Sequence, residues 1–258
     1  MKSKEEIQEY ANQVCENNEY LLRRFVRHSV INTGEDLDRI RNKQVLYVSN
    51  HRSHFDYLQQ CYNINRLNLP WPSTLARANV FIPCLADIWI NAGAIKLPFN
   101  TKGKRELRYI KKVIRRAVKD GKSILDYAQS GRDYGNIYKE FDRGAIDFTL
   151  RAARELNLEI MLMPMYINYS NSHSLEQPFF QTLNRVKGKL RNVPYVATDL
   201  AAFAFSLVYP KQLAFHAFGE PFLLNDCKTG KEATQKAYES MMQLHKKFSD
   251  AVSNWPGR

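Results

Sequence analysis

The chain of 258 residues contains no run of about 18 uninterrupted apolar residues, which is the length that a membrane-spanning helix needs. The nearest candidate, residues 193–209, is interrupted by Pro194 and Asp199. The charged N-terminal stretch, residues 1–6, lacks the apolar core of a secretory signal peptide. These absences predict a cytoplasmic protein without a transmembrane helix.

Cysteine is scarce, and the four cysteines show no Cys-x-x-Cys spacing. We expect reduced thiols, and we predict neither a disulfide framework nor a zinc site. A Gly-x-Ser-x-Gly elbow is missing as well, which disfavours a hydrolase that uses this nucleophile. No recognisable nucleic-acid-binding motif occurs, so nucleic acid is not expected as a partner.

Acidic residues are too few to balance the basic ones, because 26 Asp and Glu stand against 38 Lys and Arg, giving a formal net charge of +12. Such a balance indicates an anionic partner, which by charge alone is an acidic membrane surface, a phosphorylated substrate or nucleic acid. Much of the positive charge lies in residues 102–122, where apolar residues recur at helical spacing. We predict an amphipathic helix there. Its basic side is either an ordinary solvated face or a contact for lipid headgroups or nucleotide phosphates.

Apolar and β-branched runs alternate with helical patterns along the rest of the chain. Strands are predicted at 45–48, 73–76, 123–127, 159–167 and 213–218, and helices at 55–62, 102–122, 148–155 and 231–253. This alternation predicts an α/β fold with a mostly parallel central sheet flanked by helices. Residues 159–167 are the most apolar strand and are expected to lie centrally in that sheet.

The N-terminal segment, residues 1–40, is predicted to be an amphipathic helical segment that precedes an α/β domain of residues 41–258. Residues 4–31 carry apolar side chains at helical spacing, which predicts one helix or a broken pair of helices. Basic residues near the end of this segment leave two interpretations open. It is either a helix packed on the core or a basic amphipathic segment that lies on lipid.

The chain is organised around residues 45–56, where an apolar strand stops at Asn50 and His51. His51 is therefore expected at the carboxyl end of a strand, where α/β sheets bind their ligands. Asp56 follows in the first turn of the predicted helix, from which its carboxylate can reach the imidazole. A carboxylate on one ring nitrogen fixes the tautomer and leaves the other nitrogen able to take a proton. This arrangement indicates a general base and its orienting residue.

Two other interpretations of the same residues have to be considered. His51 can be a turn histidine, with Asp56 a first-turn charge favoured by the helix dipole. His54 would complete a His-x-x-His-x-Asp pattern for a metal ion, but no further ligand cluster accompanies it, so no metal is predicted.

The string Asn50-His51-Arg52-Ser53-x-x-Asp56 resembles the first sequence block of the glycerolipid acyltransferases, the glycerol-3-phosphate and lysophosphatidic acid acyltransferase group. Further blocks of that family follow in the same order. Residues 75–79 and 93–96 resemble the approach to the second block, residues 127–132 the third, and residues 163–167 the fourth. The resemblance covers about residues 44–222.

The resemblance implies a role for particular residues. The expected catalytic residues are His51 and Asp56, and the expected substrate-binding residues are Ser53, Lys96, Gln129, Gly131 and Arg132. Acyl transfer from a thioester to an alcohol needs a base for the hydroxyl proton and donors for the oxyanion, and backbone N–H groups around Gly131 are candidates for the latter. Arg132 and Lys96 are candidates for binding phosphate, since a guanidinium fork matches phosphate oxygens.

Gln129 departs from the family pattern, which has glutamate at this position. The change removes a negative charge beside Arg132 and predicts an anionic acceptor other than glycerol-3-phosphate, such as a lysophospholipid.

The resemblance implies transfer of a fatty acyl group from acyl-CoA or an acylated acyl carrier protein to a hydroxyl of such an acceptor, without a cofactor. We expect the protein to bind peripherally to the inner face of an anionic membrane. The alternative is a non-catalytic lipid- or partner-binding protein on the same scaffold.

Overall fold

The computed structural model describes residues 4–32, 37–53, 56–78, 81, 86–98, 103–129, 140–169 and 212–253. The strands in these residues are β1 (Val26–Asn32), β2 (Gln44–Ser49), β3 (Pro72–Arg77), β4 (Ile95–Leu97), β5 (Ser123–Tyr127), β6 (Ile160–Tyr169), β7 (Gln212–Phe218) and β8 (Phe222–Leu223). The helices are α1 (Lys4–Phe25), α2 (Asp56–Arg66), α3 (Ala86–Asn91), α4 (Lys104–Lys119), α5 (Gly144–Glu155) and α8 (Gly230–Ser253), with 3-10 turns η1 (Leu37–Ile40) and η3 (Leu224–Asp226).

The strands form one mixed sheet in the order β1-β7-β6-β2-β5-β3-β4, with β8 beside β6. Pairing is parallel except where β6 meets β7 and β8. The α/β fold with a mostly parallel sheet and an N-terminal helix is therefore confirmed. Among the described residues, no helix combines the length and the apolar character that a membrane span requires.

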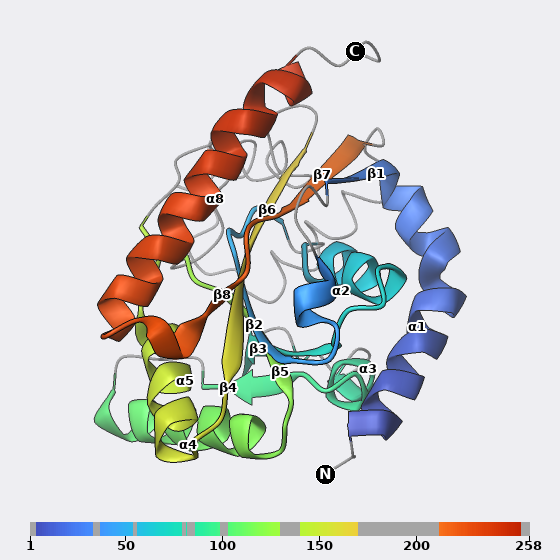
Figure 1. The fold of residues 1–258 in the computed structure, drawn as a ribbon. Coiled ribbons are helices and arrows are strands. Elements are labelled where there is room, and N and C mark those ends of the chain that lie inside the picture. Colours follow the sequence, from blue (N-terminus) through green and yellow to red (C-terminus); the bar gives the residue numbers. More distant parts are fainter. Residues whose placement is uncertain are drawn as a thin grey trace, which may run out of the picture.

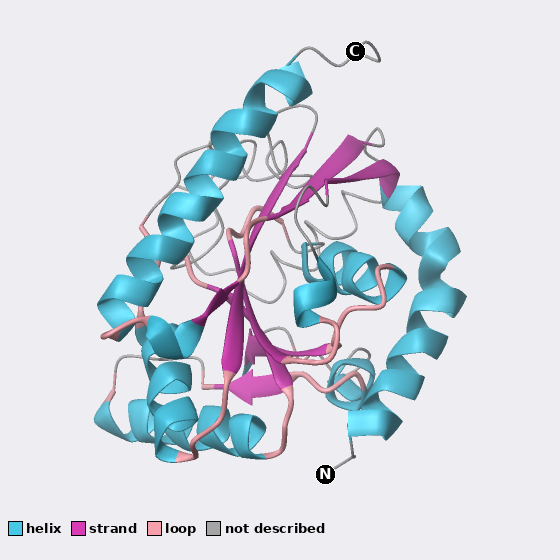
Figure 2. Ribbon diagram, in the orientation of Figure 1, coloured by secondary structure: helices cyan, strands magenta, loops and turns pink. Residues whose placement is uncertain are grey.

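The sheet separates two layers of helices, as Figures 1 and 2 show. On one face, Leu46 of β2 packs in a cluster with Ile114 of α4 and with residues of α5 and α8. On the other face, Tyr47 of β2 packs with Ile64 of α2 and with η1. Successive side chains of a strand point to opposite faces, so β2 contributes to both cores. Its carboxyl end is consequently held from both sides.

Strand β6 is buried at all ten positions and is an interior strand of the sheet, as its apolar sequence predicts. The antiparallel partners on its other edge change along its length, because β8 pairs with Met161 and Leu162 whereas β7 pairs from Met165 onward. Pro164 lies between these two partners, and its carbonyl accepts the N–H of Gly219 at 2.8 Å. A proline, which lacks an N–H, is tolerated in this interior strand because it sits at the break between β7 and β8.

The N-terminal helix is shorter than the sequence pattern predicts. The expected helix of residues 4–31 ends at Phe25, and residues 26–32 form β1, which pairs in parallel with β7. Helical spacing of apolar residues continues into this stretch, but its valines and isoleucine favour a strand. An otherwise open edge of β7 provides the partner. The division of the chain into domains at residue 40 stays a prediction.

The first half of helix α1 packs against the rest of the protein. Ile7 and Cys15 are buried there in a cluster with Trp71, beside α2 and α3. Glu5, Glu9 and other polar residues of the same half are exposed. For this half of α1, these contacts favour a helix packed on the core over a segment that lies on lipid.

Candidate active site

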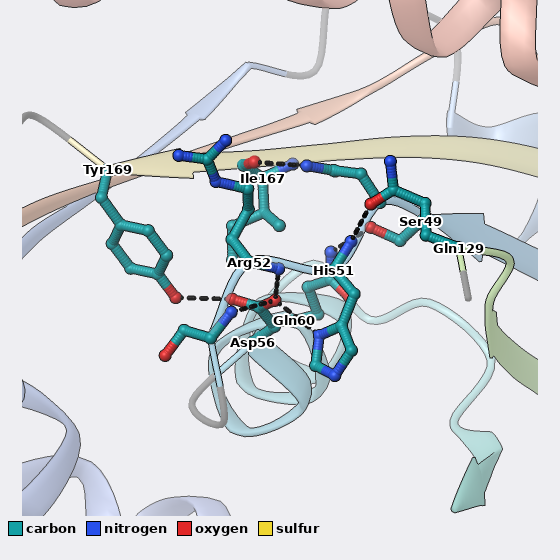
Figure 3. A network of polar contacts seen from close by, with 10 residues as sticks. Ser49, His51, Arg52, Asp56, Gln60, Gln129, Ile167 and Tyr169 are labelled. Carbon is teal, nitrogen blue, oxygen red and sulfur yellow. Dashed lines mark hydrogen bonds and ion pairs between the residues drawn. The ribbon is translucent and has the colours of Figure 1, made fainter. Parts of the chain in front are cut away.

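The loop between β2 and α2 begins with a side chain that continues the sheet. Asn50 is fully buried, and its amide donates to the carbonyl of Ile167 and accepts the N–H of Ile167, both at 2.8 Å. These bonds replace the ladder bonds that β2 would make with β6 if its backbone continued past Ser49. The start of the loop is therefore fixed to β6 (Figure 3).

His51 and Asp56 lie in contact within this loop, as the sequence predicts. The imidazole Nδ1 is 2.8 Å from Asp56 Oδ2, and the His51 side chain is 19% exposed while that of Asp56 is fully buried. An ionised carboxylate only accepts hydrogen bonds, so Nδ1 carries the proton and Nε2 of the neutral ring keeps its lone pair. Figure 3 places Nε2 on the side of the ring that faces away from Asp56.

The carboxylate of Asp56 accepts further hydrogen bonds, which make its burial tolerable. The backbone N–H groups of Arg52 and Ser53 donate to Oδ2, the latter at 2.8 Å. The Tyr169 hydroxyl donates to Oδ1 at 2.7 Å from the end of β6. Because a buried carboxylate is costly unless it is hydrogen-bonded, this convergence of donors offsets the burial of Asp56 beside His51.

Gln129 holds the main chain of His51 in place. Its Oε1 accepts the His51 N–H at 3.0 Å, and the Gln129 side chain is buried. The neighbouring N–H of Ala128 donates to the carbonyl of Ser49 at 3.2 Å. The end of β5 is thereby attached to the end of β2. The amide carbonyl of glutamine supplies the same acceptor to the His51 N–H that a glutamate carboxylate would.

Two further ionisable side chains near Asp56 are kept neutral by burial. Burial raises the pKa of the Tyr127 phenol well above its ordinary value, and the charge of Asp56 adds to this effect. Burial lowers the pKa of His216 to about 4, although Asp56 opposes the change. Within the described part of the chain, neither ring nitrogen of His216 has a hydrogen-bond partner. Two uncharged aromatic groups, Tyr127 and His216, thus lie near Asp56 at neutral pH.

The remaining predicted site residues lie in three different situations. Ser53 is fully buried and contributes its backbone N–H to Asp56. Lys96 is exposed on β4, with its ammonium 5.5 Å from the Phe81 ring centroid. Two strands separate β4 from β2, a distance of roughly 14 Å, so the sheet does not bring Lys96 beside His51. Gly131 and Arg132 lie outside the described residues.

Asn50, Tyr127 and Tyr169 are part of this arrangement but were not predicted as site residues. Asn50 belongs to the first sequence block, and Tyr127 opens the third. Tyr169 has a weaker signal: it ends the most apolar strand, and the carboxyl ends of neighbouring parallel strands meet at one edge of a sheet. That signal identifies the edge but not the contact with Asp56.

The model of the family described as Acyltransferase matches residues 27–168, which is more than half of the chain. The chain belongs to the acyltransferase family. The match runs from β1 to β6 and includes the loop that carries His51 and Asp56, and it confirms the family resemblance that the sequence indicates.

Similar members of the acyltransferase family are much longer than this chain. The glycerol-3-phosphate acyltransferase of Xanthomonas axonopodis pv. citri is 26% identical over 191 residues, which cover 71% of this chain and 20% of that protein. The glycerol-3-phosphate acyltransferase of Xylella fastidiosa (strain 9a5c) is 27% identical over 128 residues, 49% of this chain and 15% of that protein. The chain spans about a fifth or less of the length of these curated relatives.

A solved structure shares the fold. The 1-acyl-sn-glycerophosphate (LPA) acyltransferase PlsC from Thermotoga maritima superposes with a TM-score of 0.53 at 13% sequence identity. The superposition covers 97% of this chain and 80% of the other. The fold of this family member is therefore that of a known acyltransferase structure.

Proposed function

We propose that the protein is an O-acyltransferase that moves a fatty acyl group from acyl-CoA or an acyl carrier protein to a hydroxyl of a lysophospholipid or a glycerol-phosphate-like acceptor. The observation that supports this most directly is the 2.8 Å contact between His51 Nδ1 and Asp56 Oδ2. It leaves Nε2 of a partly exposed imidazole to act as a general base. Membership of the acyltransferase family gives the reaction class.

In the proposed reaction, Nε2 of His51 takes the proton of the acceptor hydroxyl. At the same time, the hydroxyl oxygen of the acceptor attacks the thioester carbonyl. The resulting imidazolium is stabilised by the buried Asp56 carboxylate. Collapse of the tetrahedral intermediate breaks the carbon–sulfur bond, and the departing thiolate recovers the proton from His51. The products are an ester and a free thiol, and the enzyme returns to its initial protonation state.

In the experiment, the protein is incubated with a panel of hydroxyl acceptors and one of two donors, acyl-CoA or an acylated acyl carrier protein. The free thiol and the acylated product are detected by mass. His51→Ala is expected to lower turnover by about 10²–10⁴-fold, the usual share of general acid–base catalysis. His245→Ala is a matched control, because it removes an imidazole that contacts Tyr166 on the opposite face of the sheet. We expect it to retain turnover within about twofold.

Two outcomes would contradict the proposal. Thiol release that is unchanged in His51→Ala, with the fold intact by circular dichroism, would exclude His51 as the base. If the protein binds lipid but releases no thiol with any acceptor tested, it is instead a non-catalytic binding protein on an acyltransferase scaffold.

We also propose that the protein binds anionic membranes through α4. Seven of the eight basic residues of this helix are exposed, while Ile110 and Ile114 are buried against the sheet. Leu107 and Tyr109 on the same helix are 39% and 46% exposed. Exposed cations beside apolar and aromatic side chains suit a surface that carries anionic headgroups. The exposed cations are Lys104, Arg105, Arg108, Lys112, Arg115, Arg116 and Lys119.

A further inference from the structure

The two oxygens of the Asp56 carboxylate have different partners. Oδ2 contacts the His51 imidazole and accepts the N–H groups of its own loop, whereas Oδ1 accepts the hydroxyl of Tyr169 at 2.7 Å. Tyr169 is the last residue of β6 and lies 113 residues from Asp56 in the sequence. In Figure 3 its phenol approaches the carboxylate from the side opposite to the imidazole. One carboxylate therefore joins the hydroxyl of Tyr169 to the ring of His51.

The Tyr169 hydroxyl affects the imidazole through the charge that the two oxygens share. A hydrogen bond to an ionised acceptor draws negative charge toward the donor and is stronger than a bond between neutral groups. Charge held at Oδ1 is withdrawn from Oδ2, the oxygen that would stabilise the imidazolium form of His51. The side chain of Asp56 and the whole of Tyr169 are fully buried, and in such surroundings electrostatic effects are screened less than in water.

We propose that Tyr169 is a positioning residue that sets the basicity of His51 by donating its hydroxyl to the far oxygen of Asp56. The importance of this link for catalysis rests on the proposed function, but the link itself does not. With the hydroxyl, the imidazole gives up its proton at a lower pH and is ready to act as a base. Without it, Oδ2 carries more charge, the imidazolium is favoured, and the ring stays protonated to a higher pH.

The same strand provides a matched control. Tyr166 is also buried in β6, and its hydroxyl also has a polar partner, His245 Nδ1 at 2.9 Å. Tyr166, however, belongs to the cluster on the opposite face of the sheet. Tyr166→Phe and Tyr169→Phe each remove one buried hydroxyl from the same strand. A purely structural role of Tyr169 predicts that the two variants behave alike.

The experiment is a titration of the His51 imidazole by NMR in the full chain labelled at histidine, with the signal assigned by its loss in His51→Ala. We expect Tyr169→Phe to move the midpoint upward by roughly half a pH unit or more, and Tyr166→Phe to leave it in place. The low-pH limb of the rate profile is expected to move by the same amount. A midpoint that is unchanged in Tyr169→Phe, or that moves equally in both variants, would overturn the proposal.

A second substitution covers the case in which Tyr169→Phe does not fold. Site-specific 3-fluorotyrosine at position 169 keeps the shape of the ring and makes the hydroxyl a stronger donor. It is expected to move the His51 midpoint downward, and an upward shift or no shift would contradict the proposal. The titration does not depend on turnover. A shifted midpoint in a protein without acyl transfer would therefore refute the proposed function alone, and transfer with unshifted midpoints would refute only the role of Tyr169.

Discussion

The imidazole of His51 is stacked on the ring of Tyr127, with 4.4 Å between the ring centroids and 30° between the planes. Tyr127 is the last residue of β5, the strand next to β2. The carboxylate of Asp56 fixes one edge of the imidazole, and Tyr127 limits the tilt of its face. Two neighbouring strands thus contribute to the orientation of one ring.

This stacking predicts different effects for two substitutions of Tyr127. Within the described residues its buried hydroxyl has no hydrogen-bond partner, so Tyr127→Phe should raise the free energy of unfolding by up to about 1 kcal/mol and retain turnover. Tyr127→Ala removes the stacked ring and should lower turnover at least tenfold. Urea denaturation and thiol-release assays measure the two effects. Equal turnover in both variants would show that the ring does not orient His51.

Gln129 is expected to influence the choice of acceptor. The glutamine amide offers a donor group that glutamate lacks, and it leaves the site more positive than a glutamate would. The wild type should therefore prefer a lysophospholipid or another anionic lipid alcohol to glycerol-3-phosphate. Gln129→Glu retains an acceptor for the His51 N–H and should shift the preference toward glycerol-3-phosphate. A wild-type preference for glycerol-3-phosphate that Gln129→Glu leaves unchanged would contradict this prediction.

Asn50→Ala should reduce both stability and turnover. The substitution leaves the N–H and C=O of Ile167 buried without their partner, at a cost of about 3 kcal/mol, and it releases the start of the His51 loop. Asn225→Ala is a close control, because the Asn225 amide bridges Leu158 and Ile160 at the other end of β6. We expect it to lower stability similarly but to leave turnover per folded molecule unchanged. Equal turnover in the two variants would argue against a special role of the Asn50 bridge.

Two buried ionisable groups should make opposite contributions to the pH dependence of stability. His216 has a pKa lowered by burial to about 4, so between about 4 and 6.5 the unfolded chain binds a proton that the folded chain does not. Its contribution to stability therefore rises with pH in that window. Burial and the nearby Asp142 raise the pKa of Asp126 to about 7, so from about 4 to 7 the folded chain binds the extra proton. The contribution of Asp126 therefore falls as the pH rises.

Substituting either His216 or Asp126 should leave the other residue's contribution to the pH dependence of the free energy of unfolding. Asp126→Asn is expected to make stability rise more steeply between pH 4.5 and 6.5 than in the wild type, by up to about 1.4 kcal/mol per pH unit. His216→Leu should change the slope in the opposite direction. Urea denaturation at three pH values in this range measures both slopes. Slopes that match the wild type in both variants would contradict the assigned protonation states.

Binding to anionic vesicles should depend on α4 and on salt. Neutralising Arg105, Arg108 and Lys112 together is expected to weaken binding by about two orders of magnitude, since each cation near a membrane contributes about 1 kcal/mol. Turnover of water-soluble substrates should not change, because α4 and α2 pack on opposite faces of the sheet. Vesicle sedimentation at several salt concentrations is the measurement.

The control for the role of α4 in vesicle binding is an equal change of charge at another helix, α8. Lys228→Gln, Lys231→Gln and Lys247→Gln together remove three exposed cations in and just before α8. Vesicle binding that weakens equally in both triple variants would indicate an effect of net charge, and not a membrane surface on α4.

The sequence was sufficient to predict β2, the position of His51 at its end and the contact with Asp56, because all three depend on residues close together in the chain. It failed for residues 26–32, where a helical pattern and β-branched residues give conflicting signals and the partner strand β7 decides the outcome. The bond between Tyr169 and Asp56 could not be predicted either. It requires β6 to lie beside β2, and nothing local to either residue encodes that neighbourhood.

Gln129 illustrates a limit of a different kind. Its departure from the family pattern is visible in the sequence and suggested a role in recognising the acceptor. The structure adds that the Gln129 carbonyl supports the backbone of His51, a function that depends on an atom common to glutamine and glutamate. A sequence comparison registers the change of charge but not the acceptor that remains.

The carboxylate of Asp56 stabilises its own loop through the N–H groups of Arg52 and Ser53, whereas the imidazole of His51 is partly open to solvent. The two residues would therefore not be lost together if selection for chemistry were relaxed. A descendant that only binds lipid could replace His51 at little cost to folding, but it would tend to keep Asp56. Of the two residues, the histidine is the more informative sign that a chain with this loop still has a catalytic task.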